Sequence, residues 1–211
     1  MGWPIKRVDL GEVEYHQALA DMRTWVEERQ QGLAEDRLFL LSHPAIVTYG
    51  PRTDPADLPA DLPAVQVDRG GFATYHGPGQ LVGYLVADVK ARGPVDIVRW
   101  LENGLVEALA SLGFPAIRRD TPKGASSLAG VWTPDLRKVA SIGMRIRRGV
   151  TSHGFALNVD PDMAAFHRFT ACGLADVTMA SLAELAAEQR RGTPSGSEVR
   201  DAAFASLTAG S

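Results

Sequence analysis

The sequence predicts an α+β fold with a largely antiparallel sheet, and two observations support this prediction. Apolar residues recur at helical spacing in two parts of the chain, and most of the other segments are short apolar runs bounded by glycine and proline. The resulting order of helix, strands, helix, strands and helices is typical of an α+β domain. We expect residues 1–211 to form one domain, because a chain of this length can bury a sizeable core.

The first third of the chain predicts one helix and several short strands. The helix ends at Gly32. Its apolar stripe consists of Tyr15, Ala18, Leu19, Met22, Trp25 and Val26. Residues 37–50 predict two strands around a Ser-His-Pro turn. Residues 51–64 carry a proline about every four positions and predict an extended surface loop. Residues 65–89 predict three strands, separated by glycine-rich turns.

The remaining elements follow from a second apolar stripe and from capping signals. Pro94 suits the first turn of a helix whose buried stripe we expect to be Val95, Val98, Leu101, Leu105, Leu109 and Leu112. Residues 129–159 predict strands with turns near Pro134-Asp135 and Arg148-Gly149. Two capping boxes, Ser181 with Glu184 and Ser195 with Glu198, predict two short helices at the end of the chain.

Composition limits the function classes. A net charge of −3 lacks the basic footprint of a nucleic-acid-binding protein. No apolar run is long enough for a membrane span or a signal peptide, so we expect no membrane partner. A single cysteine excludes an intrachain disulfide framework and fits the reducing cytoplasm. Five histidines without an i,i+4 pair predict no metal site.

The stretch RGGFATYHGPGQ, residues 69–80, is rich in glycine but is not a phosphate-binding loop. It matches neither G-x-x-x-x-G-K-[ST] nor G-x-G-x-x-G. One interpretation is a set of tight turns between strands. The other is the wall of a groove for an extended, mostly apolar substrate, because glycine lets backbone approach a ligand closely. Tyr75 and His76 would then border the groove.

The stretch KVASIGMRIRRGVTSHGFALN, residues 138–158, combines core positions with positive charge. Val139, Ile142, Met144, Ile146 and Val150 predict buried positions. Five basic residues and no acid lie between Leu136 and Val159, which predicts either a solvated hairpin face or a dock for an acidic partner. Lys138 begins an apolar strand, and a lysine drawn into such a pocket can act in acid–base chemistry.

Cys172 is the only cysteine of the chain. A free cysteine usually behaves as a small apolar residue, and it becomes a nucleophile only beside a base or a positive group. Lys138, His76, His153 and His167 are the candidate partners. A Ser-His-Asp triad has no support from a G-x-S-x-G elbow.

The sequence resembles the lipoyl(octanoyl) transferase family in three motifs and in their order and spacing. These motifs are RGGFATYHGPGQLVGY, KVASIGMRIRRGVTSHGFALNV and CGL. The resemblance covers about residues 37–182. It implies the catalytic-domain fold of biotin and lipoate protein ligases, with a mixed sheet flanked by helices. It also implies transfer of an octanoyl group from acyl carrier protein to a lysine on lipoyl domains of 2-oxoacid dehydrogenase complexes or on the glycine-cleavage H protein, with no cofactor.

The resemblance assigns roles to particular residues. It implies Cys172 as the acyl-accepting nucleophile and Lys138 as the residue that activates it. The implied substrate-binding residues are Arg69, Gly70, Gly71, Phe72, Ala73, Thr74, Tyr75, His76, Ser141, Ile142, Gly143, Gly154, Phe155 and Ala156. The charge pattern adds Arg145, Arg147 and Arg148 as candidates for docking the acidic carrier protein. The family usually has proline before the cysteine and a compact Val-Thr-Ser-Leu after it, whereas this chain has Ala171 and the longer stretch 177–182.

Two alternatives share parts of this pattern. An ATP-dependent lipoate or biotin ligase would use a lysine matching Lys138 but would not need Cys172, and the biotin-ligase signature G-R-G-R-x-G is absent. A non-catalytic binder of carrier protein or lipoyl domain would need neither residue.

Overall fold

The computed structural model describes residues 3–173 and 177–209, and at Cys172 it describes the backbone alone. The elements follow one another as β1 Lys6–Glu12, α1 Tyr15–Gln30, β2 Arg37–Ser42, β3 Ile46–Tyr49, η1 Pro55–Asp57, β4 Ala64–Gln66, β5 Thr74–His76, β6 Gln80–Val86, α2 Pro94–Ser111, β7 Ile117–Arg118, β8 Gly130–Trp132, β9 Lys138–Arg147, β10 Val150–Asn158, η2 Met163–Arg168, η3 Ala171–Gly173, α3 Leu182–Glu188 and α4 Gly196–Thr208.

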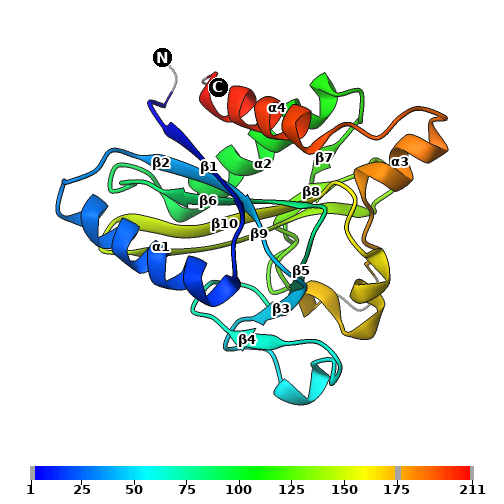
Figure 1. The fold of residues 1–211 in the computed structure, drawn as a ribbon, viewed down its shortest axis with the longest axis horizontal. Helices are drawn as coiled ribbons and strands as arrows, with labels where there is room; N and C mark the ends of the chain where they lie inside the picture. Colours follow the sequence, from blue (N-terminus) through cyan, green and yellow to red (C-terminus); the bar gives the residue numbers. More distant parts are fainter. Residues whose placement is uncertain (1–2, 174–176, 210–211) are drawn as a thin grey trace.

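The larger sheet lies at the centre of the molecule and has the strand order β1-β2-β6-β10-β9-β8-β7 (Figure 1). β1 and β2 are parallel, and every other neighbouring pair is antiparallel. The prediction of a mixed, largely antiparallel sheet is confirmed. β1 is not among the predicted elements, because its sequence KRVDLGE contains four charged residues and no apolar run.

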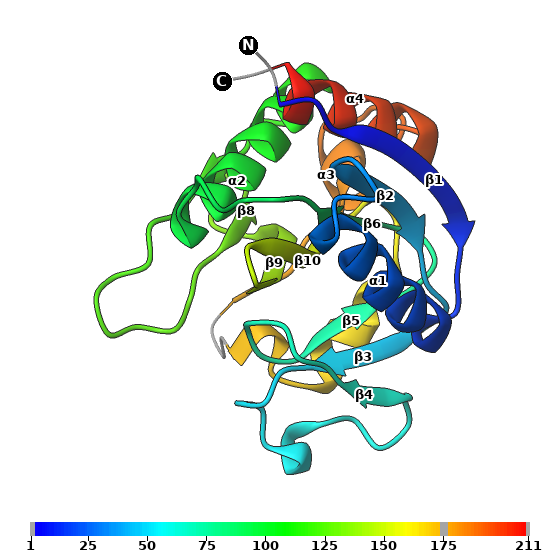
Figure 2. The ribbon, with the colours of Figure 1, turned by 90° about the vertical axis from the view of Figure 1, so that its left-hand side faces the viewer.

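A smaller sheet with the order β4-β3-β5 lies beside the larger one (Figure 2). Two of the three strands predicted over residues 65–89, β4 and β5, belong to this smaller sheet, whereas β6 belongs to the larger one. The backbone N–H of Gly70, in the loop between β4 and β5, donates to the carbonyl of Met144 on β9 at 3.0 Å. This contact holds the loop against β9.

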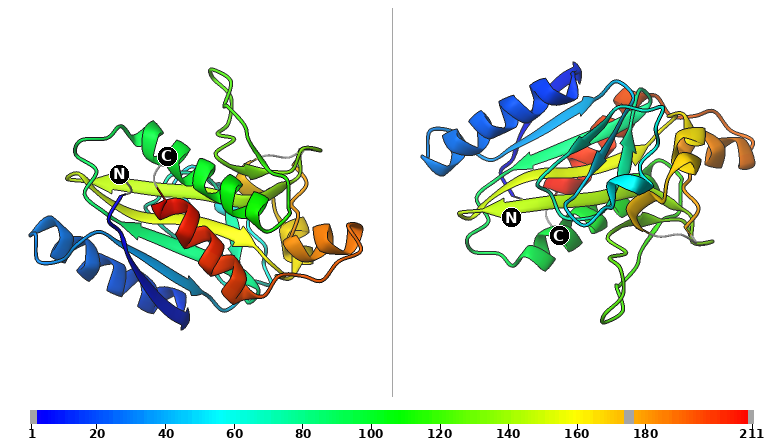
Figure 3. Two further views of the ribbon diagram at one scale, coloured as in Figure 1. Left: turned by 90° about the horizontal axis from the view of Figure 1, so that it is seen from above. Right: turned by 90° about the horizontal axis from the view of Figure 1, so that it is seen from below.

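Helices cover both faces of the larger sheet (Figure 3). On β2, Leu38 and Leu40 join the core beneath α2 and α4, while Phe39 and Leu41 join the core beneath α1. Because side chains alternate along a strand, a strand covered on both faces is apolar throughout. Among the described residues, no helix has the length and apolar character that a membrane crossing requires.

α2 carries the longest apolar stripe of the chain. Pro94 lies in the first turn, and Leu101, Leu105 and Leu109 are buried as predicted. The prediction is wrong at Val95, which is 61% exposed, while Ile97 is buried. Two residues correspond to about 200° around a helix, so Val95 lies on the side opposite Ile97.

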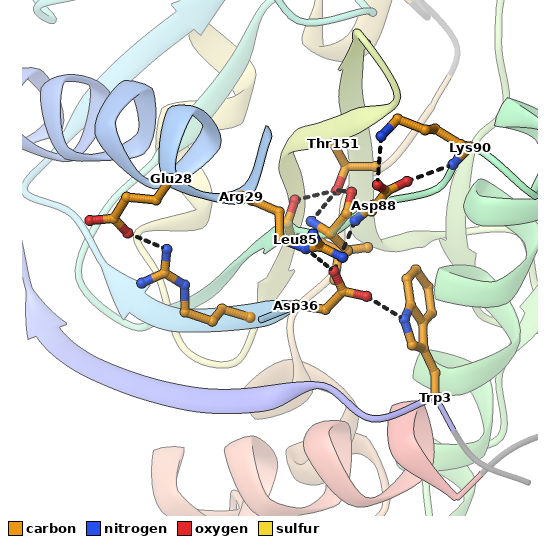
Figure 4. Close-up of polar contacts among 10 residues, drawn as sticks. Trp3, Glu28, Arg29, Asp36, Leu85, Asp88, Lys90 and Thr151 are labelled. Atoms are coloured by element: carbon orange, nitrogen blue, oxygen red, sulfur yellow. Dashed lines mark hydrogen bonds and ion pairs between the residues drawn. The ribbon is translucent and has the colours of Figure 1, made fainter. Parts of the chain in front are cut away.

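Asp36, the residue before β2, accepts hydrogen bonds from three segments that are distant in the sequence (Figure 4). Asp36 accepts hydrogen bonds from the indole N–H of Trp3 at 2.7 Å, from Nε of Arg29 at 2.6 Å and from the backbone N–H of Asp88 at 2.9 Å. These donors belong to the N-terminal segment, to α1 and to the chain after β6. The contacts fix the end of α1 against the sheet that it covers.

The hairpin of β9 and β10 forms one side of the candidate site. Its two-residue turn, Arg148-Gly149, has φ values of 51° and 79°, as a type I′ turn requires. β8 pairs with β9 only as far as Ser141, so the second half of β9 is an edge that faces the loop containing Gly70. This edge leaves room for a cavity.

Both predicted capping boxes are confirmed. The side chain of Ser181 accepts from the backbone of Glu184 and begins α3, and the side chain of Ser195 accepts from the backbone of Glu198 and begins α4. Each glutamate also accepts from the backbone N–H of its serine. Such caps are local, so sequence alone locates them.

Candidate active site

One cavity collects most of the residues that the sequence motifs single out. It has a volume of about 490 Å³ and lies between the loop that precedes β5, the strand β5 and the hairpin of β9 and β10. The wall contains Arg69, Gly70, Gly71, Phe72, Thr74, His76, Lys138, Ser141, Ile142, Gly143, Gly154, Phe155 and Ala156. Folding therefore brings the two long motifs to one place.

Two residues of the first motif do not line this cavity, which corrects their assignment. Ala73 is 2% exposed and lies within the core. The ring of Tyr75 packs edge to face on Phe166, with centroids 5.5 Å apart, in a cluster that includes Ala171. Because side chains alternate along a strand, Thr74 and His76 face the cavity while Tyr75 faces away.

Lys138 is held at the start of β9 by the segment that precedes α3. Its backbone N–H donates to the carbonyl of Thr178, and its carbonyl accepts from the N–H of Ala180, both at 2.9 Å. Its side chain is 2% exposed, and Nζ lies 5.2 Å from the centroid of the Trp132 ring. The stretch 177–182 thus pairs with the backbone of Lys138 on one side and β8 pairs with it on the other, and the residue lies in the cavity wall.

Cys172 lies in the short helix η3, but its side chain falls outside the described part of the structure, and so does the Cys172–Lys138 pair. Its neighbours can be placed. The N–H of Gly173 donates to the carbonyl of Thr170 at 3.3 Å. A Cβ on Gly173 would lie 2.6 Å from the ring of Phe72, which lines the cavity. The backbone beside Cys172 therefore contacts the cavity wall.

The guanidinium of Arg69 binds backbone carbonyls of the loop that contains it and of β3. Nη2 donates to the carbonyl of Thr48 at 3.0 Å and to its hydroxyl at 2.9 Å, while Nη1 donates to the carbonyls of Gly70 and Phe72, each at 3.0 Å. The residue is 8% exposed. A buried charge needs such hydrogen bonds, and here they fix the backbone of the cavity wall.

The tautomer of His76 follows from a chain of hydrogen bonds. Nδ2 of Asn158 donates to the carbonyl of Ala180 at 3.0 Å, so Oδ1 of Asn158 accepts from Nε2 of Gln80 at 2.9 Å. Oε1 of Gln80 is then an acceptor, and Nδ1 of His76, 3.1 Å away, must donate to it. Burial, with the nearby His43 as a second cause, holds the pKa of His76 well below its usual range. His76 is therefore neutral, and its Nε2 can only accept.

The closed end of the cavity contains residues that the sequence did not single out as functional. Nδ1 of His43 lies 2.7 Å from the carbonyl of Val13, and Nε2 lies 2.7 Å from the hydroxyl of Tyr84. A carbonyl only accepts, so Nδ1 donates and Tyr84 donates to Nε2. Burial raises the pKa of Tyr84 well above its usual range, and burial also raises the pKa of Tyr15. Both tyrosines line the cavity as neutral phenols. In the sequence, Tyr15 belongs only to an apolar stripe.

The other two candidate partners of the Cys172 thiol, His153 and His167, lie in different places. His153 lines the cavity, whereas His167 is exposed in η2 and does not. Burial, followed by the charges of Arg69 and Arg145, lowers the pKa of His153 to about 3. Within residues 3–173 and 177–209, no cluster of three His, Cys, Asp or Glu side chains could hold a metal ion.

The arginine patch lies at the end of β9 remote from Lys138. Arg145 forms an ion pair with Asp68, and Arg147 and Arg148 are exposed at the hairpin turn. At about 3.3 Å per residue, Lys138 and Arg147 are separated by roughly 30 Å along β9. The patch is therefore distinct from the cavity mouth near Lys138.

Comparisons with known proteins identify the same family from sequence and the same fold from structure. The family model of the lipoyl protein ligase A/B catalytic domain matches residues 14–207. An octanoyltransferase of Frankia casuarinae is 46% identical over 196 residues, which cover 90% of this chain and 89% of that protein.

Two solved structures share the fold. A lipoate-protein ligase A bound with ATP has a TM-score of 0.70 at 17% identity, covering 98% of this chain and 85% of that chain. A bipartite lipoate protein ligase from Thermoplasma acidophilum, studied with its E2 lipoyl domain, has a TM-score of 0.67 at 18% identity, with coverages of 96% and 82%. At these identities, the structures establish the fold alone.

Proposed function

The chain belongs to the family of lipoyl protein ligase A/B catalytic domains, and we propose that it transfers an octanoyl group to lipoyl domains through a thioester on Cys172. Its activity is octanoyl transfer in lipoylation, as in the octanoyltransferases that it resembles over most of its length. The covalent route, the roles of single residues and the identity of the donor are our proposal.

One observation supports this route most directly. The buried amine of Lys138 and the loop around Arg69 line one cavity, and the backbone next to Cys172 contacts Phe72 in the same wall. A nucleophile and the group that activates it must both reach the reacting carbonyl. These residues are distant in sequence, and the positions of Lys138 and of the backbone next to Cys172 at one cavity wall support the proposed pair.

The chemistry requires two transfers. In the first, the Cys172 thiolate attacks the carbonyl carbon of the octanoyl thioester, and the donor thiolate leaves and takes up a proton. In the second, the unprotonated amine of the acceptor lysine attacks the thioester on Cys172, the Cys172 thiolate leaves, and the nitrogen loses a proton as the amide forms. We assign the proton transfers to Lys138.

This route needs no nucleotide. Exchange of one thioester for another is nearly balanced, and conversion of a thioester into an amide is downhill, so the donor thioester is already activated. The covalent intermediate splits one difficult transfer into two easier steps. Backbone amides near Gly143 are our candidates for stabilising the oxyanion, each contributing about 3 kcal/mol in comparable sites. Ligases of this fold can bind ATP, but they resemble the chain only as a scaffold.

We propose octanoyl-acyl carrier protein as the donor, with lipoyl domains of 2-oxoacid dehydrogenase complexes and the glycine-cleavage H protein as acceptors. Membership of the octanoyltransferase and lipoate ligase family supports carrier protein or lipoyl domains as substrates. We keep Arg147 and Arg148 as candidate docking residues for the acidic carrier. We further propose that residues 1–211 act as a single catalytic domain in the cytoplasm.

Intact-mass analysis tests the proposed route. The protein is incubated with octanoyl-carrier protein without nucleotide, and a mass increase of one octanoyl group, located on Cys172 by peptide mapping, is expected. A parallel sample contains free octanoate with ATP and Mg²⁺. Both samples also contain a lipoyl domain, because a ligase would activate octanoate as a non-covalent adenylate and would not be modified itself. Octanoylation of that domain only in the second sample would favour the ligase alternative, and no octanoylation of protein or domain in either sample would favour a non-catalytic binder.

A further inference from the structure

A second cavity continues from the first along the hairpin of β9 and β10. It has a volume of about 560 Å³ and shares one lining residue, His153, with the candidate active site. On β10 the first cavity is lined by His153 and the residues that follow it, while the second is lined by Ser152 and His153. The two cavities therefore meet at His153.

The first cavity is open at one end and closed at the other. Near α2 it is lined by the exposed residues Pro94 and Ser127. At the other end its lining residues are almost completely buried: Thr74, His76, Val82, Tyr84, His153 and Ala156 are 1–6% exposed. An acyl chain gains most from burial at the closed end, because that end removes its surface from water.

His153 lies at the closed end in a constrained position. Its φ of 60° lies in the left-handed region, which few residues other than glycine adopt. Nε2 lies 3.3 Å from Oδ1 of Asp68, and Asp68 also forms an ion pair with Arg145. The backbone N–H of His153 donates to the sulfur of Met22 on α1 at 3.1 Å. The contact with Asp68 thus orients the imidazole, and the contact with Met22 fixes the backbone that carries it.

The space behind His153 has an apolar side and a polar side, and Glu27, Gln30, Gln66, Asp68, Arg145 and Ser152 belong to the polar side. One side of the second cavity is formed by the apolar side chains of Leu19, Met22 and Val26 along α1, with Val67 beside them. Arg23, Arg147 and Arg148 line it as well and are exposed. A chain that enters from the first cavity and runs along α1 would therefore contact Leu19, Met22 and Val26.

We propose that His153 is a specificity-determining residue, the end wall that limits the length of the acyl chain. From Ala156, opposite Ser141, to His153, opposite Met144, the distance along β10 is about 10 Å, a length that an extended octanoyl chain can span. A longer chain would meet the imidazole. Removing the imidazole would join the two cavities into one channel. This inference rests on the proposed acyl transfer.

The test compares donors of different length. Wild-type protein and His153→Gly are acylated with octanoyl- and dodecanoyl-carrier protein. The second-order rate constant of adduct formation is measured for each donor from time courses of intact mass. Glycine suits the left-handed φ, so the substitution opens the wall without backbone strain. We expect the dodecanoyl-to-octanoyl ratio to rise at least about tenfold. His153→Asn, which also tolerates this φ, should give a smaller rise.

Arg190→Gly is the matched control, since Arg190 also has a left-handed φ, 54°, but lies outside both cavities. Its ratio should equal that of the wild type. An unchanged ratio in folded His153→Gly and His153→Asn would overturn the inference while leaving acyl transfer intact. If the wild type accepts no donor at all, the proposed function itself fails.

Discussion

Gly130 and Lys138 lie so close together that any side chain at position 130 would displace the lysine. A Cβ on Gly130 would clash with the backbone carbonyl oxygen of Ala140 and would lie 2.6 Å from Cε and 3.3 Å from Nζ of Lys138. The residue also has a φ of 143°, a conformation that side chains rarely adopt, and its N–H donates to the buried carboxylate of Glu102 at 3.0 Å. Gly130 thus fixes the space in which the Lys138 amine lies.

Gly130→Ala should therefore reduce octanoyl transfer by roughly 10- to 100-fold, because a displacement of about 1 Å in a reacting group can cost that much. The rate of adduct formation on Cys172 measures this effect. Gly32→Ala serves as the control, since Gly32 also has a positive φ but no atom lies within 4 Å of its added Cβ. Equal losses in both variants would point to backbone strain rather than to Lys138.

Cys172→Ala should abolish the acyl adduct and the transfer to the lipoyl domain. Lys138→Met preserves the length of the buried side chain and should slow adduct formation by about 10²- to 10⁴-fold, as expected when a proton-transferring group is lost. Thermal unfolding checks that the Met variant folds. A rate near that of the wild type in either variant would contradict the assigned roles.

The free energy of unfolding should decrease as the pH falls below about 6.5. Burial lowers the pKa of His43, His76 and His153, the last to about 3, so the unfolded chain binds protons that the native state does not. Stability present above the ordinary histidine pKa of 6.5 is therefore lost on acidification, and His153 contributes about 1.4 kcal/mol per pH unit between pH 6.5 and about 3.

Urea unfolding at pH 7.5, 6.0 and 5.0 measures this slope. The pH range over which His153 contributes to this slope extends from 6.5, its ordinary pKa, down to its pKa of about 3 in the native state. His153→Asn should make the slope shallower by the contribution of one histidine. A stability that stays constant between pH 6.5 and 5 would show that the three imidazoles take up protons without unfolding.

Reversing both Arg147 and Arg148 to Glu should raise KM for octanoyl-carrier protein several-fold and weaken the salt dependence of KM, because complementary charge speeds encounter. Kinetics with octanoyl-pantetheine, which lacks the protein, should not change. Lys6→Glu, on the opposite edge strand of the sheet, is the control. If KM stays constant, the patch is a solvated face and the carrier docks elsewhere.

Local features of the fold could be predicted from the sequence. The capping boxes at Ser181 and Ser195 and the turn at Arg148-Gly149 depend on hydrogen bonds and φ values within a few residues, so the residues alone locate them. Predictions failed where burial depends on distant partners. Val95 continues an apolar pattern yet faces solvent, and the charged strand β1 is stabilised by pairing with β2.

The sequence by itself determined the family, the activity and the identity of Lys138 and Cys172 as candidate catalytic residues, because the motifs that carry them are long and specific. Only the tertiary structure decided which of these residues share a cavity. Tyr75 turns away from it, Tyr84 lines it with His43 bound to its hydroxyl, and His153 separates it from a second cavity. Strand register and the packing of two sheets set these positions through contacts between distant segments, and no local pattern encodes such contacts.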